Sequence, residues 1–284
     1  MDTEALLANI REGSLSQDKA RALTADELAA RNASGNTVLH TAAKYGRLRD
    51  LNPAVLTAEL FSLKNDSGYT PLHQVAFGGH FGQLPTGLLS RSHFLVRSNS
   101  GYTPLHTAAA AGTLAQVPSE VGAINHELLL IRTDLGNTLL HEAAETGAID
   151  RLPPNLLTER LLAERNLSGE TVLHVAALNG HLGQIPASLL TPALLATRNY
   201  EGVTPLATAV RRGNIDHLPE GLRPEEPGIV KRTMIKWGCP ARHFKDARIR
   251  PVKQASRVTQ NKRGATFWIA PQMIQFRQRF RGVT

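Results

Sequence analysis

One pattern of hydrophobic and polar positions recurs six times along the first three quarters of the chain. Each copy reads G-x-T-x-L-x-x-A/V-A/V-x-x-G, so that a Thr precedes a short apolar stretch and a second Gly follows it. The copies begin at intervals of 33, 33, 35, 33 and 33 residues, at Gly35, Gly68, Gly101, Gly136, Gly169 and Gly202. Chance does not produce five such intervals around so detailed a pattern, and we therefore interpret it as a tandem structural repeat.

Each copy predicts a tight turn followed by a helix. The leading Gly is preceded by Asn, Asp and Ser, as in Asn65-Asp66-Ser67-Gly68, and a tight hairpin turn of this kind needs a positive φ angle. The Thr two residues later can cap a helix, and the second Gly can end it. Three copies have Pro directly after the Thr, where its missing N–H does no harm. The capping positions are Thr37, Thr70, Thr103, Thr138, Thr171 and Thr204.

The second half of each copy predicts a helix that is broken. It follows the pattern L-P-x-x-L-L-T-x-x-L-L, most clearly from Leu152 to Leu162. The proline at position 153 predicts the start of a single turn, and Thr158 can then cap a second short helix. We therefore expect a broken or kinked outer helix in each copy.

Taken together, these features resemble the ankyrin repeat, which has a period of about 33 residues and a T-P-L-H-x-A core. The segment T-P-L-H-T-A, from Thr103 to Ala108, carries that core without change. The resemblance covers roughly residues 1–222. It implies an all-helical solenoid of about seven repeats joined by short hairpin loops. The family usually has a continuous second helix, and the prolines described above depart from that form.

The resemblance also predicts how the chain is divided. Residues 1–34 are expected to form a degenerate capping repeat, because Gly13 aligns with Gly46 and Leu7 stands where later copies have His. Full repeats are expected at 35–67, 68–100, 101–135, 136–168 and 169–201, and a truncated last repeat at 202–222. Residues 223–228 are expected to be a linker. Residues 229–284 are expected to be a partly ordered or disordered extension that resembles no family.

A histidine occupies the same place in five copies. Stacked helices lie about 8–10 Å apart, whereas zinc needs its ligand atoms at about 2.0–2.3 Å, so such a row cannot close around one ion. The resemblance implies instead that these residues bond the hairpin backbone and are structural. Cys239 and His243 lack a third group that would complete a catalytic or metal site. We expect no enzyme, catalytic residue, metal site or cofactor. The histidines are His40, His73, His106, His141 and His174.

The resemblance implies that a partner protein binds the concave surface, through positions that differ between copies. Four of these are aromatic and three are acidic, which predicts a partner segment with apolar anchors and Lys or Arg. In the alternative interpretation, Tyr69 and Tyr102 merely cover the hairpins. The candidate binding residues are Lys44, Tyr45, Tyr69, Phe77, Tyr102, Asn137, Glu142, Glu145, Glu170 and Leu178.

Charge is divided unevenly along the chain. The net charge is +8, of which residues 225–284 contribute +11 and residues 1–224 contribute −3. Aromatic residues are interleaved with the basic ones, a combination that can bind phosphates and stack on bases. The alternative function is therefore an adaptor whose extension binds nucleic acid or another polyanion while the repeats hold a protein. Its candidate residues are Lys231, Arg232, Lys236, Arg248, Arg250, Lys253, Lys262, Arg263, Arg277, Arg279 and Arg281.

Three other roles for the extension remain open. It can stay solvated or fold only with a partner, and residues 271–282 can form a basic amphipathic helix for an anionic membrane or a partner's groove. It can also bind the acidic positions 142, 145 and 170 of the same chain.

The overall expectation is a non-catalytic protein–protein interaction scaffold. No apolar stretch approaches the ~18 residues of a membrane-spanning helix, and the N-terminal residues do not resemble a secretory signal. The single cysteine fits a reducing compartment. We expect an intracellular, cytoplasmic protein, with a nuclear location open if the source is a eukaryote. The identity of the partner and the oligomeric state are left open.

Overall fold

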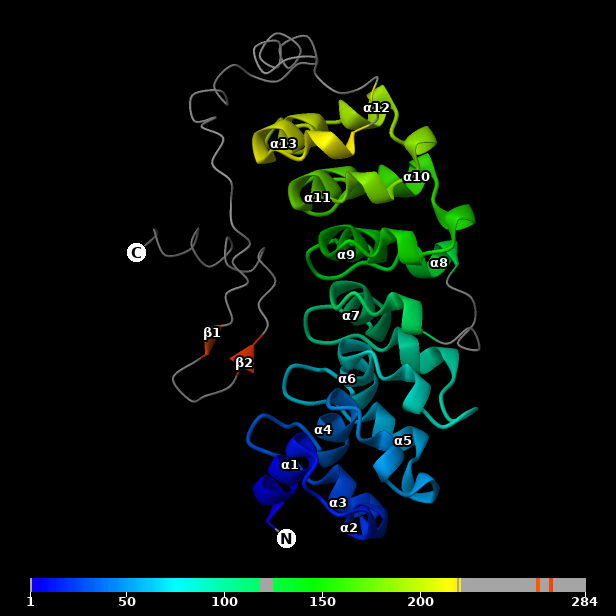
Figure 1. Cartoon of the computed structure of the whole chain (residues 1–284), viewed down its shortest axis with the longest axis vertical. Helices are drawn as coiled ribbons and strands as arrows, with labels where there is room; N and C mark the ends of the chain where they lie inside the picture. The colour runs from blue at the N-terminus through cyan, green and yellow to red at the C-terminus, as the bar shows by residue number, and fades with distance from the viewer. Residues whose placement is uncertain (1, 118–124, 219, 221–258, 261–265, 268–284) are drawn as a thin grey trace. The chain divides into compact units, whose positions relative to one another are not determined.

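The structure, a computed structural model, describes residues 2–117, 125–218, 220, 259–260 and 266–267 (Figure 1). The chain divides into two compact parts, residues 1–247 and 248–284, which are described separately. The linker predicted at 223–228 lies outside the described residues, as does nearly all of the basic extension. No helix in the described part is both long and apolar enough to cross a membrane.

The first part, residues 1–247, is built on a stack of inner helices. In Figure 1 these helices lie one above another, and each contacts the next in the order α1, α4, α6, α7, α9, α11, α13. They span Thr3–Glu12 (α1), Val38–Lys44 (α4), Pro71–Gly78 (α6), Pro104–Ala110 (α7), Leu139–Thr146 (α9), Val172–Asn179 (α11) and Pro205–Arg212 (α13). The predicted all-helical organisation, with helices packed in sequential order, is confirmed over these residues.

Outer segments flank this stack. Their α-helices are short and span Gln17–Ala22 (α2), Ala25–Ala29 (α3), Ala58–Ser62 (α5), His126–Leu129 (α8), Glu159–Leu162 (α10) and Pro192–Leu195 (α12). The 3-10 helices span Leu48–Asp50 (η1), Pro53–Val55 (η2), Phe81–Gln83 (η3), Arg91–Leu95 (η4), Leu114–Gln116 (η5), Ile149–Arg151 (η7), Pro154–Leu156 (η8), Leu182–Gln184 (η9), Ala187–Leu189 (η10) and Ile215–His217 (η11).

The predicted break in the outer helix is confirmed. We call each inner helix, with its hairpin and outer segment, a unit of the stack. In the unit that contains α10, the 3-10 helix η8 precedes α10, and the hydroxyl of Thr158 accepts a hydrogen bond from the backbone N–H of Leu161. Thr57 and Thr191 cap α5 and α12 in the same way. The prolines stop a continuous helix, because each removes a backbone donor and crowds the preceding turn.

The core of the first part of the chain consists of leucine and small residues. Paired alanines such as Ala42 and Ala43 on α4, or Ala143 and Ala144 on α9, have no exposed surface. Alanine adds little bulk, so successive inner helices can pack closely. Larger side chains fill the space beneath the outer segments, where the ring of Phe81 stacks on Phe94 with 6.3 Å between centroids.

Hairpin loops join each outer segment to the next inner helix. Gly68 shows why the leading glycine recurs, since its φ angle is +77° and a Cβ there would lie 2.6 Å from the backbone nitrogen of Asn99. Both features exclude a larger residue. The glycine therefore sets the turn and also the close approach of the following hairpin.

Within residues 248–284, the described residues form two short strands. β1 (Thr259–Gln260) pairs antiparallel with β2 (Thr266–Phe267), with Thr259 opposite Phe267. The sequence prediction of an all-helical chain did not include this ladder, because four paired residues leave no readable alternation of polar and apolar positions.

Candidate functional site

The recurrent histidines join each inner helix to the hairpin of the next unit. The backbone N–H of Thr37 donates to Nδ1 of His40 over 3.1 Å, so Nε2 carries the proton and donates to the carbonyl of Tyr69 over 2.9 Å. Burial lowers the pKa of all five histidines to about 4. The other acceptors are the carbonyls of Tyr102, Ile131, Glu170 and Val203. Both ring nitrogens of each histidine are thus engaged inside the protein.

Residues that differ between units occupy equivalent positions along the stack. The residue seven positions after each capping Thr is half-buried or exposed, and we call this set the inner row: Lys44, Phe77, Ala110, Glu145, Leu178 and Arg211. The residue directly before each capping Thr belongs to a hairpin, and we call this set the hairpin row: Asn36, Tyr69, Tyr102, Asn137, Glu170 and Val203. Eight of the ten candidate binding residues belong to these rows, and the other two, Tyr45 and Glu142, contact members of them.

The inner row begins with a cation between two aromatic rings. The Nζ atom of Lys44 lies 5.4 Å from the ring centroid of Phe77 and 5.6 Å from that of Tyr45. These distances are in the range of cation–π attraction. The two rings are 39% and 41% exposed, and burial lowers the pKa of Lys44. This end of the row is therefore an uncovered apolar patch that contains one positive charge.

The two hairpin tyrosines lie against the histidines of their own units. The ring of Tyr69 meets that of His73 edge to face, with 5.3 Å between centroids, and Tyr102 lies 6.0 Å from His106. The hydroxyl of Tyr102 donates to Oε1 of Glu142 over 3.1 Å, in the following unit. Burial and this carboxylate raise the pKa of Tyr102.

A buried polar chain continues from Glu142. Its Oε1 also accepts from Nδ2 of Asn137 over 2.9 Å, and Oδ1 of Asn137 accepts from Nδ2 of Asn166 over 3.0 Å. Asn166 in turn donates to Oε2 of Glu170 over 3.3 Å. Glu142 is only 1% exposed, and burial, together with the nearby charge of Glu145, raises its pKa to about 7. Two hydrogen bonds thus do not offset the cost of burying this carboxylate.

Two further carboxylates lie beside this chain. Burial raises the pKa of Glu145, and repulsion from Glu170 raises it further. Burial also raises the pKa of Glu170, with a contribution from Glu201. Among the residues that the structure describes, no Lys or Arg forms an ion pair with Glu142, Glu145 or Glu170. The middle of the stack is therefore acidic, and within the described residues these three carboxylates have no cationic partner.

Sequence reasoning missed a recurrent basic residue six positions before each capping Thr. Arg31 donates through Nη1 to the carbonyl of Gly35 in its own hairpin (2.9 Å) and to that of Lys64 in the next unit (2.7 Å). Arg132 and Arg165, three and four units further along, make the same pair of bonds. The 33-residue spacing was the available signal. The set is Arg31, Lys64, Arg97, Arg132, Arg165 and Arg198.

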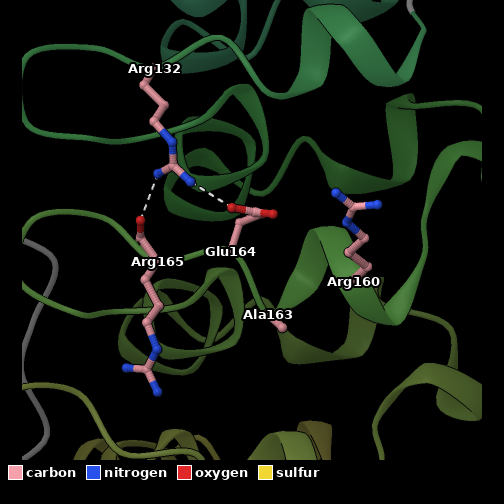
Figure 2. A pocket seen from close by; sticks show the side chains of 5 residues that line it. All are labelled: Arg132, Arg160, Ala163, Glu164 and Arg165. Carbon is pink, nitrogen blue, oxygen red and sulfur yellow. Dashed lines mark hydrogen bonds and ion pairs between the residues drawn. The ribbon is translucent and has the colours of Figure 1, made fainter.

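A cleft of about 400 Å³ lies at one point of this basic set, and Figure 2 shows the side chains that line it. It is lined by Arg132, Arg160, Ala163, Glu164 and Arg165. The guanidinium of Arg132 points at the carboxylate of Glu164 and at the carbonyl of Arg165, and both are bonded to it (Figure 2). The cleft thus lies between side chains that connect neighbouring hairpins.

Several predicted residues lie outside the described part of the chain, namely Cys239, His243 and all candidate polyanion-binding residues. Within the described part, no three His, Cys, Asp or Glu residues are grouped so as to hold a metal ion. No family model matches the chain, and no curated protein matches its sequence.

Proposed function

We propose that residues 1–222 form an ankyrin-type array that binds a partner protein through the inner and hairpin rows and performs no catalysis. The observation that carries this proposal is the separation of constant from variable side chains. The capping Thr, the His beside it and the turn Gly recur in nearly every unit and hold the fold together. The inner row changes from cation to ring, alanine, carboxylate, leucine and cation along the same helix position.

The variable row is also accessible. A stack of repeats presents equivalent positions as one extended surface, which is how solenoids contact a partner over several units. Phe77 and Tyr45 supply uncovered aromatic area, and aromatic residues contribute disproportionately to binding energy at protein interfaces. A surface whose residues vary while the frame stays constant is suited to recognition of one particular partner.

A pair of matched variants tests the proposal. Ala110 lies in the middle of the inner row and is half-buried, whereas Ala193 is exposed on outer helix α12. We expect Ala110→Tyr to remove proteins that the wild-type chain captures from a lysate, because the added ring covers the row. Ala193→Tyr should leave the captured set unchanged. If both variants capture the wild-type set, binding does not use the inner row.

A second candidate function rests on the segregation of charge. Residues 225–284 carry a net charge of +11, and a polyanion that binds them would release counterions, so affinity should fall steeply with salt. In this function the extension attaches the captured protein to nucleic acid. The test is fluorescence anisotropy of labelled single- and double-stranded nucleic acid at two salt concentrations, with the full chain and with a chain that ends at Pro224. Equal binding by both chains would refute it.

A further inference from the structure

The inner row changes character at α7. On its N-terminal side stands the exposed ring of Phe77, and on its C-terminal side the carboxylate of Glu145. Between them the row position is Ala110, followed by Ala111 and Gly112, so no long side chain fills the row at this helix. A side chain from another molecule can therefore lie over Ala110 with an aromatic ring on one side and an acidic group on the other.

The acidic side is arranged to favour an added cation. Glu145 and Glu170 are half-buried, an acidic neighbour raises the pKa of each, and no Lys or Arg among the described residues forms an ion pair with either. A carboxylate that has lost part of its hydration and has no cation nearby gains more from an incoming charge than an exposed one does. Lys or Arg heads are thus the complementary groups.

The aromatic end of the row disfavours a cationic side chain of the partner. Lys44 already lies over Phe77 and Tyr45, which places a positive charge at the beginning of the row. A second cation there would meet repulsion, whereas an apolar side chain would cover ring surface that is now exposed. The row therefore distinguishes two ends of a ligand, one apolar and one basic.

We propose that the inner row binds an extended segment of a partner protein that places an apolar side chain on Phe77 and Ala110 and Lys or Arg side chains at Glu145 and Glu170. This inference rests on the proposed function, since it names the partner class for the same face. Adjacent inner helices are about 8–10 Å apart, so Phe77 on α6 and Glu145 on α9, two helices further along, are separated by about 16–20 Å. An extended chain covers that distance in about five or six residues.

The test is selection of random peptides, displayed on phage, against the full-length chain. We expect enriched sequences to have Lys or Arg about five or six residues from a Leu, Phe, Met or Trp. Enriched acidic sequences, enriched sequences without charge preference, or no enrichment would each overturn the inference. Tiled peptides from residues 229–284 are included, and if only these bind, the occupant is the chain's own basic sequence and not a partner.

Variants that replace a carboxylate with the neutral amide of the same shape then locate the contact. The strongest selected peptide should bind the double variant Glu145→Gln/Glu170→Gln at least about tenfold more weakly than the wild type, because each substitution removes an anionic group without changing its shape. Glu159→Gln, on the exposed surface of α10, is the matched control and should bind like the wild type. Unchanged binding by the double variant would overturn the inference.

The Ala110→Tyr variant separates this inference from the proposed function. If Ala110→Tyr abolishes peptide binding while the double Gln variant does not, the face binds a partner but the basic class is wrong. If neither substitution affects binding, both proposals fail. Circular dichroism and thermal unfolding of each variant establish that loss of binding is not loss of the fold.

Discussion

Glu142→Gln should stabilise the protein at neutral and alkaline pH. The wild-type carboxylate is almost fully buried, and its pKa is raised from 4.5 to about 7, first by burial. Between these two pH values the folded state retains a proton that the unfolded state has lost. The free energy of unfolding therefore contains a favourable contribution that is complete below about pH 4.5, falls as the pH rises, and is lost above about pH 7.

The size of the effect follows from the same two values. One pKa unit corresponds to about 1.4 kcal/mol, so the full shift amounts to about 3 kcal/mol. Glutamine has no proton to lose and keeps an oxygen that accepts from Tyr102 and Asn137. The difference in unfolding free energy, variant minus wild type, should thus increase by about 2–3 kcal/mol from about pH 5 to about pH 8.

The assay is urea unfolding followed by circular dichroism at a series of pH values, with wild type and variant measured side by side. Taking their difference at each pH removes the contribution of the five histidines, which both chains share. Glu159→Gln on exposed α10 reports the effect of the same chemical change without burial. A variant-minus-wild-type difference that stays constant over this pH range would refute the reasoning, because it would show that Glu142 is ionised equally in both states.

Two further predictions concern the repeat frame. Burial lowers the pKa of each recurrent histidine from 6.5 to about 4, so between these pH values the unfolded state binds protons that the folded state excludes. The stabilising contribution of the neutral histidines should be fully present above about pH 6.5, and the free energy of unfolding should fall steeply from there towards pH 4. An unfolding free energy that does not decline over this range would contradict the assignment of neutral, buried rings. Gly68→Ala should destabilise the protein by about 2 kcal/mol, because φ is +77° and the new Cβ would meet the backbone of Asn99. Gly82→Ala is its control, since a Cβ there meets nothing within 4 Å. Equal midpoints of thermal unfolding for these two variants would show that the hairpin tolerates a side chain.

Much of the local structure was determined by short stretches of sequence. Thr70 and Pro71 define where α6 begins, and Gly79, with φ of +73°, defines where it ends. Pro153 and Thr158 likewise predict the interrupted outer helix. These features depend on backbone sterics and on hydrogen bonds between residues a few positions apart, and such interactions are readable from residue order alone.

The contacts between units were decided only by the tertiary structure. Tyr102 reaches Glu142 across 40 positions, and Asn166 reaches Asn137 across 29. The period of the repeat shows which residues are equivalent, but not how far one unit is shifted against the next or which atoms then meet. Glu142 was recognisable as an acidic candidate, yet its near-complete burial and raised pKa arise from that stacking offset.

The basic residues beside the hairpins illustrate the same division. The sequence by itself contains the recurrence of Arg31, Arg132 and Arg165, and it indicates a charged residue at one place in the repeat. Only the packed structure shows that each guanidinium donates to a carbonyl of the following unit, which makes it a link between repeats. Hydrogen bonds between units depend on distances that no local pattern encodes, and for that reason residue order indicated the frame, while the histidine bond to a hairpin was expected only from the family resemblance and the other cross-connections were not expected at all.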